Sequence, residues 1–191
     1  MGEFDLIERF FKQKVAPAPA NQARAATNSI VLGIGDDCAL LQPAPGTQLA
    51  VSTDMLVEGR HFFADVDPSA LGHKALAVNL SDLAAMGAEP LAFTLALALP
   101  PARAQDAPWL DAFSDGLLAL AGAHGCALVG GHTGEGQELA LGFAINGLVD
   151  ETLAGVARKG GMRAGDVLLL TKPKRLQRSI LTDCKTCATT G

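Results

Sequence analysis

Residues 74–90 read KALAVNLSDLAAMGAEP and lie in a longer segment, 68–86, whose length and alanine and leucine content predict a helix. At 3.6 residues per turn, Asp82 falls on a face where Asn79 is its only polar neighbour. The other members of that face are Leu71, Ala75, Val78 and Met86. A carboxylate removed from water is costly unless it is hydrogen-bonded or binds a cation. Asp82 therefore indicates either a core hydrogen bond, to Lys74 or a backbone amide, or a metal site.

The other segments combine helical and strand patterns. Residues 3–14 predict an amphipathic helix, and the Pro-, Ala- and Asn-rich residues 16–28 predict a flexible loop. The turn at 43–46 predicts that two strands, 29–32 and 48–53, pair with each other. A strand, a helix and two more strands are expected at 90–99, 108–124, 126–129 and 138–149. The fold class is therefore α/β.

Two further acids resemble Asp82 in their apolar surroundings. Asp37 ends GIGDD, and Asp54 follows Ser52 and Thr53 in VSTDMLVEG. Each has an ordinary interpretation: GIGDD as a tight turn in which Gly35 takes a positive φ, and STD as a strand end that caps a turn. One shared cause accounts for all three acids better. Carboxylates and hydroxyls are hard oxygen ligands suited to Mg²⁺, which phosphate oxygens commonly complete, so the pattern points to phosphoryl transfer.

The glycine-rich segment GGHTGEG, residues 130–136, adds a second phosphate signal. After a short strand, Gly130 and Gly131 would let backbone amides approach an anion, and His132 and Thr133 follow them. Such turns are common, so the signal is weak by itself. The chain contains neither a G-x-G-x-x-G nor a G-x-x-x-x-G-K-[ST] motif, so a nucleotide would be held in another way.

Composition restricts the partners and the location. The formal net charge of −5 over 191 residues comes without a basic stripe, which argues against nucleic acid as a partner. The start of the chain does not resemble a signal peptide, and its apolar runs are shorter than the roughly 20 residues that span a bilayer. We therefore expect no membrane partner and a cytoplasmic location. Cys184 and Cys187 form a CxxC pair, but a zinc site needs four ligands and no second pair exists.

Several motifs together carry a family resemblance. In order and spacing, EFDLIERFF, GIGDDCALL, STDMLVEGRHF, KALAVNLSDLAAMGAEP, TLALALP and FSDGLLALAGAHGCALVGG closely resemble the amino-terminal half of thiamine-monophosphate kinases, over about residues 2–131. The resemblance implies the fold of the aminoimidazole-ribonucleotide synthetase superfamily: a mixed sheet flanked by helices, which dimerises through the sheet and binds ATP near the dimer interface. It implies transfer of the ATP γ-phosphoryl group to thiamine monophosphate. By the same resemblance His61 contacts the substrate, and the magnesium ligands are Asp37, Ser52, Thr53, Asp54 and Asp82.

The chain departs from that family in two places. His132 stands where the family usually has an aspartate, and about residues 130–173 are more similar to selenide, water dikinase, an alternative activity in the same superfamily. The amino terminus, however, lacks the reactive cysteine that selenide dikinases carry. We expect an ATP- and magnesium-binding domain at 1–150, the start of a truncated second domain at 151–173 and an atypical tail at 174–191. A non-catalytic nucleotide-binding fragment with weak or absent turnover is therefore a further alternative.

Overall fold

The computed structural model describes residues 2–14, 29–35 and 37–150. The first elements are helix α1 (Glu3–Phe10), a 3-10 turn (Lys12–Lys14) and two short strands, β1 (Ile30–Leu32) and β2 (Leu40–Leu41). The rest are β3 (Thr47–Val57), α3 (Pro68–Ala85), β4 (Glu89–Leu99), α4 (Pro101–Ala104), α5 (Ala107–His124), β5 (Ala127–Glu135) and β6 (Ala140–Asp150). Among the described residues, no helix is both long and apolar enough to cross a membrane.

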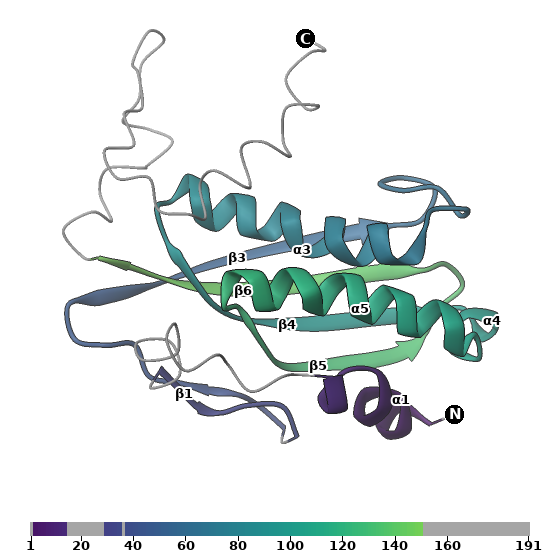
Figure 1. Cartoon of the computed structure of the whole chain (residues 1–191), viewed down its shortest axis with the longest axis horizontal. Coiled ribbons are helices and arrows are strands. Elements are labelled where there is room, and N and C mark those ends of the chain that lie inside the picture. Colours follow the sequence, from purple (N-terminus) through teal and green to yellow (C-terminus); the bar gives the residue numbers. More distant parts are fainter. Residues whose placement is uncertain (1, 15–28, 36, 151–191) are drawn as a thin grey trace, which may run out of the picture.

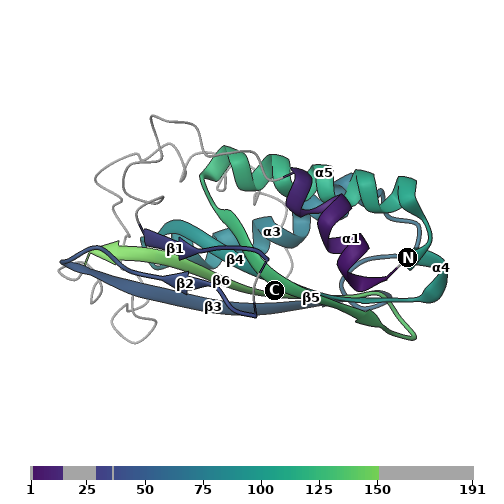
Figure 2. The same ribbon diagram turned by 90° about the horizontal axis from the view of Figure 1, so that it is seen from below.

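The main sheet contains four strands in the order β3-β6-β4-β5. β4 and β5 are parallel, whereas β6 is antiparallel to both β3 and β4, so the predicted mixed sheet is confirmed. Helices α3 and α5 lie side by side over one face of this sheet, and α1 lies beside its β5 edge (Figures 1 and 2). Consequently β3 and β5 are the two edges of the described sheet.

The core lies between the sheet and its two long helices. Alternate strand residues such as Phe93 and Ile145 are fully buried there against α3 and α5. The two helices approach closely at Gly72 and Gly116, where there is no room for a side chain. A Cβ added at Gly72 would lie 2.1 Å from the Phe113 carbonyl oxygen, and one added at Gly116 would lie 2.1 Å from the Ser69 carbonyl oxygen. Glycine at both positions therefore fixes the separation of α3 and α5.

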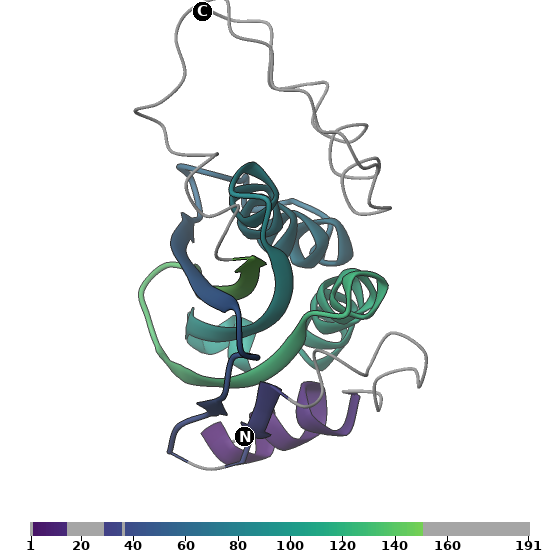
Figure 3. The ribbon, with the colours of Figure 1, turned by 90° about the vertical axis from the view of Figure 1, so that its left-hand side faces the viewer.

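The opposite face of the sheet is strongly curved (Figure 3). The β1–β2 pair covers part of it, where Ile30 and Leu41 pack against a small buried cluster that includes Ala92. Elsewhere this face presents apolar side chains of β3: Val51 and Met55 are 61% and 60% exposed. An apolar surface of this kind is typical of an interaction site.

The amino-terminal segment is held by apolar and charged contacts. Phe10 and Phe11 of this segment are buried. Lys14 Nζ lies 2.9 Å from Ser114 Oγ, 2.8 Å from Asp115 Oδ1 and 3.0 Å from Asp111 Oδ1, all on α5. Burial lowers the pKa of Lys14, but the hydrogen bonds to Asp115 and Asp111 and their charges raise it more, so its net pKa is raised. Lys14, in the 3-10 turn that follows α1, therefore joins the amino-terminal segment to α5 through ion pairs.

Most predicted elements are confirmed, with differences that have physical causes. The helix predicted at 68–86 ends one residue earlier, and Gly87 follows it with a φ of 67°. The predicted pairing of strands 29–32 and 48–53 is wrong: β1 pairs with β2, and β3 pairs over its whole length with β6. The turn signal is local, whereas an eleven-residue partner is available to β3 only far along the chain. The predicted segments 16–28 and 151–191 lie outside the described residues.

Candidate functional site

Three of the predicted site residues form a group that we call the β3 cluster: Ser52 and Asp54 of β3, and Asp82 of α3. Ser52 and Asp54 alternate with exposed residues, and both are half-buried on the side of the sheet where Leu56 enters the core. Ser52 Oγ donates a hydrogen bond to Asp82 Oδ2 at 2.8 Å. Strand and helix are thus joined at this point by two oxygen-bearing side chains.

The acids are less buried than their sequence surroundings suggested. Asp37 and Asp82 are exposed, and Asp54 is half-buried. The reason for Asp82 is positional: α3 lies over the edge strand β3, so the face that begins with fully buried Leu71 ends with Met86, which is 38% exposed. Asp82 bonds to Ser52, whereas Lys74, a suggested partner, bonds to a loop carbonyl. The prediction of a buried carboxylate was therefore wrong.

His61 follows β3 in the loop that leads to α3. The Val57 backbone N–H donates to His61 Nδ1 at 3.0 Å, and the His61 backbone N–H donates to the Val57 carbonyl at 2.9 Å. Because Nδ1 accepts this hydrogen bond, the N–H of a neutral His61 ring is at Nε2. The exposed His61 side chain can therefore offer an N–H donor to an anion.

Apart from Thr53, the other predicted residues line a cleft of about 810 Å³ at the β5 edge, which we call the β5 cleft. Its polar lining includes Asp37, Gly130, Gly131, His132 and Thr133. Its apolar floor comes from Leu95 and Leu97 of β4 and Leu128 of β5. A wall is formed by α1 and the two residues that follow it, with lining residues Asp5, Glu8, Phe11 and Lys12. The cleft can accommodate an apolar group beside polar and charged atoms.

The glycine-rich segment belongs to a strand and not to a turn. β5 extends through Glu135, so Gly130 and Gly131 pair with Thr94 and Leu95 of β4. A Cβ at Gly131 would lie 2.1 Å from the Leu95 carbonyl oxygen, so packing alone requires glycine there. The predicted strand of four residues was too short because glycine usually weakens a strand interior. Since β5 is an edge among the described strands, alternate backbone N–H groups point away from β4.

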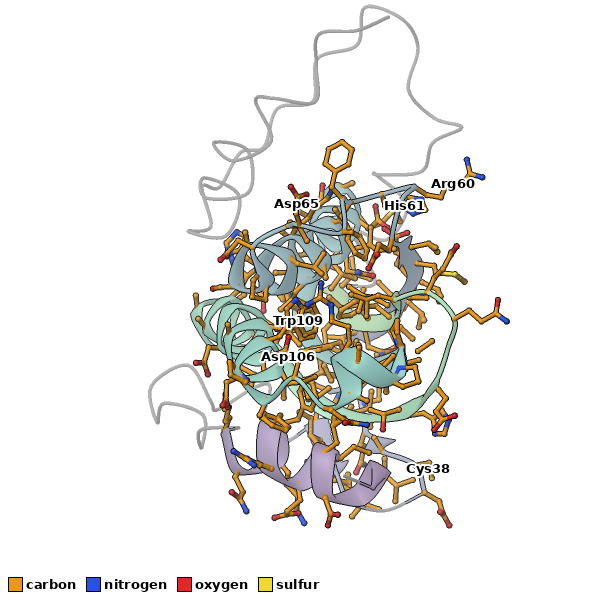
Figure 4. The ribbon with its side chains drawn as sticks, turned by 90° about the vertical axis from the view of Figure 1, so that its right-hand side faces the viewer. Cys38, Arg60, His61, Asp65, Asp106 and Trp109 are labelled. Atoms are coloured by element: carbon orange, nitrogen blue, oxygen red, sulfur yellow. The ribbon has the colours of Figure 1, made fainter. Side chains whose placement is uncertain are left out.

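The β3 cluster and the β5 cleft lie at opposite edges of the sheet. Three strand spacings separate β3 from β5, which is about 14 Å. In Figure 4, Cys38, which follows Asp37 in the sequence, lies at one end of the molecule and His61 lies at the other. In the part of the chain that the structure describes, no three His, Cys, Asp or Glu side chains are close enough to hold a metal ion. One chain therefore does not bring Asp37 to Asp54 and Asp82.

Thr53 and the two described cysteines, Cys38 and Cys126, lie outside the β3 cluster. Thr53 alternates with Ser52 and Asp54 and is exposed on the opposite face of β3. Burial raises the pKa of the Cys126 thiol to about 12, so this thiol stays protonated and unreactive near neutral pH. Cys38 is exposed and follows Asp37, which lines the β5 cleft.

Three basic residues around these regions have roles that the sequence did not predict, although Lys74 was considered as a partner for Asp82. Lys12 lines the β5 cleft, and Lys74 and Arg103 hold carbonyl groups of the His61 loop. Lysine and arginine on a helix usually indicate a solvated face, so the sequence offered no signal for these roles. The roles of Lys74 and Arg103 depend on the backbone path of the His61 loop, which the sequence does not show.

Comparison with known proteins agrees with this fold. A family model described as AIR synthase related protein, N-terminal domain, matches residues 35–149. Thiamine-monophosphate kinase of Salmonella typhimurium strain LT2 is 46% identical over 170 residues, which are 89% of this chain and 48% of that protein. The similarity therefore extends past residue 131. The chain spans about half the length of the curated relatives that it matches.

Two solved structures are similar in both sequence and fold. The crystal structure of thiamine-monophosphate kinase from Stenotrophomonas maltophilia K279a is 43% identical with a TM-score of 0.59, covering 78% of this chain and 43% of that one. AaThiL complexed with AMPPCP and TMP is 26% identical with a TM-score of 0.53, covering 77% of this chain and 41% of that one. The chain belongs to the AIR synthase related family, whose N-terminal domain forms most of the described structure.

Proposed function

We propose that this chain carries the ATP- and magnesium-binding half of an enzyme that transfers the γ-phosphoryl group of ATP to thiamine monophosphate. The observation that carries the proposal is the β3 cluster, in which oxygen donors from β3 and α3 meet within one hydrogen bond of each other. The identity of 46% to a thiamine-monophosphate kinase, and a related structure with AMPPCP and TMP, support the same choice of substrates.

Magnesium fits the donor set of the β3 cluster. Ser52, Asp54 and Asp82 offer hydroxyl and carboxylate oxygens on a partly solvated surface. Mg²⁺ prefers such ligands, keeps several waters and takes further oxygens from phosphates, so a few protein ligands suffice. Bound there, it would neutralise charge on the transferring phosphoryl group. Asp37 and Thr53 do not reach the β3 cluster of their own chain, so we propose that they act as magnesium ligands only in the dimer described below.

The β5 cleft is the proposed seat of the nucleotide phosphates. Gly130, Gly131 and His132 lie along an edge strand whose outward N–H groups can bind phosphate oxygens. His132 adds a ring that can donate a hydrogen bond, where related kinases usually carry an aspartate. A phosphate acceptor is already anionic near neutral pH, so the reaction needs positioning and charge neutralisation and not a general base.

A homodimer would explain why the two regions lie apart. The exposed face of β3, with Val51 and Met55, gives two copies an apolar surface through which to pack sheet against sheet. In such a pair the β3 edge of one copy can approach the β5 edge of the other. ATP would then bind near the interface. Nucleic acid and membrane are not among the proposed partners, and a cytoplasmic location stays a prediction.

The test is formation of thiamine diphosphate from thiamine monophosphate, ATP and Mg²⁺, together with calorimetric binding of the same ligands. We expect Asp82→Asn to weaken magnesium-dependent ATP binding by about tenfold or more, because a metal ligand is lost. Met55→Glu should convert a dimer to a monomer in light scattering and weaken ATP binding as well. Consumption of ATP stimulated by selenide and not by thiamine monophosphate would overturn the proposal.

A further inference from the structure

The loop 58–67, between β3 and α3, presents His61 in a defined conformation. Phe62 is 7% exposed and belongs to the core, whereas its neighbour Phe63 is 80% exposed. The Gly59 N–H donates to the Phe62 carbonyl at 2.8 Å, and Gly59 has a φ of 73°, which favours glycine. Burial of Phe62 therefore forces the adjacent side chains outward and anchors the middle of the loop.

Two cationic side chains from the helical layer hold carbonyl groups of this loop. Lys74 of α3 donates from Nζ to the His61 carbonyl at 2.6 Å. Arg103 of α4 donates from Nη2 to the Ala64 carbonyl at 3.1 Å. Both hydrogen bonds have a charged donor, which makes them stronger than neutral ones.

Arg103 is itself held in place by two neighbours. Its guanidinium lies 5.2 Å from the centre of the Trp109 ring, and Nη1 lies 3.5 Å from Asp106 Oδ2. Figure 4 shows Asp106 and Trp109 below the loop that carries Arg60, His61 and Asp65. The loop is thus tied to the helical layer at two places, His61 and Ala64.

His61 is fixed at both its ring and its backbone. The ring accepts from the Val57 N–H through Nδ1, and the carbonyl accepts from Lys74. Rotation of the peptide at His61 would break the Lys74 bond, and rotation of the ring would break the Val57 bond. With both intact, Nε2–H points in one direction, so the donor is preorganised.

We propose that Lys74 is a positioning residue that acts through His61 on the phosphate of the substrate, with Arg103 as a second, weaker support. The inference rests on the proposed function, and on the expectation from the family resemblance that His61 contacts thiamine monophosphate. Lys74 has no contact with substrate in this assignment. Removal of the Lys74 ammonium should therefore leave the His61 Nε2–H donor in place but less well oriented.

A double-mutant cycle on the full chain tests this assignment, with calorimetric affinity for thiamine monophosphate in the presence of Mg²⁺ and AMPPCP as the readout. We expect Lys74→Met to weaken binding about tenfold, and Lys74→Arg to restore it to within about threefold of the original. In the His61→Ala background, Lys74→Met should have almost no further effect. Arg9→Met removes one positive charge from α1, away from the loop, and is the matched control.

A second readout does not depend on the substrate. In a long-range nitrogen–proton NMR spectrum, His61 should show a protonated Nε2 and an unprotonated Nδ1. Lys74→Met should average the two ring nitrogens and speed hydrogen exchange in residues 57–67, whereas the peptides of α3 and α5 should exchange as before. Arg103→Met should produce a smaller change of the same kind.

The outcomes separate the two proposals. If the unaltered chain does not bind thiamine monophosphate, the proposed function fails, and the NMR and exchange measurements still decide whether Lys74 orders His61. Equal weakening by Lys74→Met in both backgrounds would show that Lys74 does not act through His61. An unchanged His61 spectrum in Lys74→Met would overturn the positioning role.

Discussion

The β3 cluster and the β5 cleft are built in different ways. Side chains make the β3 cluster: Ser52 and Asp82 meet through a hydrogen bond between strand and helix. Backbone packing makes the β5 cleft, where Gly131 lies against the Leu95 carbonyl with no room for a Cβ. The difference shows that one half of the proposed site depends on functional groups and the other on the absence of a side chain. Substitutions should therefore damage them through different physical causes.

Of the substitutions considered, Gly131→Ala should have the largest effect on the free energy of unfolding. Its Cβ would lie 2.1 Å from the Leu95 carbonyl oxygen, so β4 and β5 must separate, at a cost of about 3 kcal/mol in the free energy of unfolding. Urea denaturation measures the change. Gly130→Ala is the matched control, because its Cβ would be 3.8 Å from Thr94 Cγ2, an ordinary contact. Equal stability of the two variants would contradict the packing argument.

Lys14→Met should have an intermediate effect on the free energy of unfolding, because it removes the ion pairs that hold the segment after α1 against α5. We expect a loss of about 1 kcal/mol, since the partners Asp111 and Asp115 are partly exposed and screened by solvent. Lys12→Met, which loses an exposed i,i+4 pair with Glu8, should cost less than about 0.5 kcal/mol.

The same ion pairs give a pH dependence with a defined sign. Because the folded pKa of Lys14 is raised, its stabilisation is fully present below the ordinary value of 10.5 and is lost as pH rises through the folded value. The stability difference between the original chain and Lys14→Met should therefore stay constant from pH 7 to 9 and shrink in more alkaline solution. A difference that grows with pH would contradict this account.

Ser52→Ala, in the β3 cluster, should have the smallest effect on stability. One partly exposed hydrogen bond to Asp82 is lost, which is expected to cost about 0.5–1 kcal/mol. Thermal unfolding measures this loss. Ser52→Thr, which keeps the hydroxyl, is the control, and a loss as large as that of Gly131→Ala would show that the cluster supports the fold.

The sequence predicted the helices and the individual strands well, because the signals for them, which are hydrophobic periodicity and the glycine and proline residues that end an element, are local in the sequence. The length and the alanine and leucine content of residues 68–86 predicted α3, for example, and a strand was predicted at 138–149, close to β6. Strand order was not predictable in the same way, since β3 finds its partner about ninety residues later. The acids at 54 and 82 were chosen as candidates because of their apolar neighbours, and their role in a metal site stays a prediction. Their separation from Asp37 depends on which strand edges meet, which no local pattern encodes.

Asn79 illustrates a further limit of sequence reasoning. It was identified as the polar neighbour of Asp82, and the structure buries it completely, with Nδ2 donating to the Ala75 carbonyl at 2.9 Å. Its Oδ1 has no partner among the described residues. A buried polar atom of this kind is costly, and periodicity alone gives no account of it.

The close approach of α3 and α5 at Gly72 and Gly116 has a mechanical consequence. Lys74 and Asp82 both belong to α3 and are about 12 Å apart along its axis, so any sliding of that helix displaces the His61 support and the Ser52 partner together. A side chain at either glycine would lift α3 away from α5 as a rigid rod. Two positions with no functional group of their own thereby set the alignment of the whole β3 cluster.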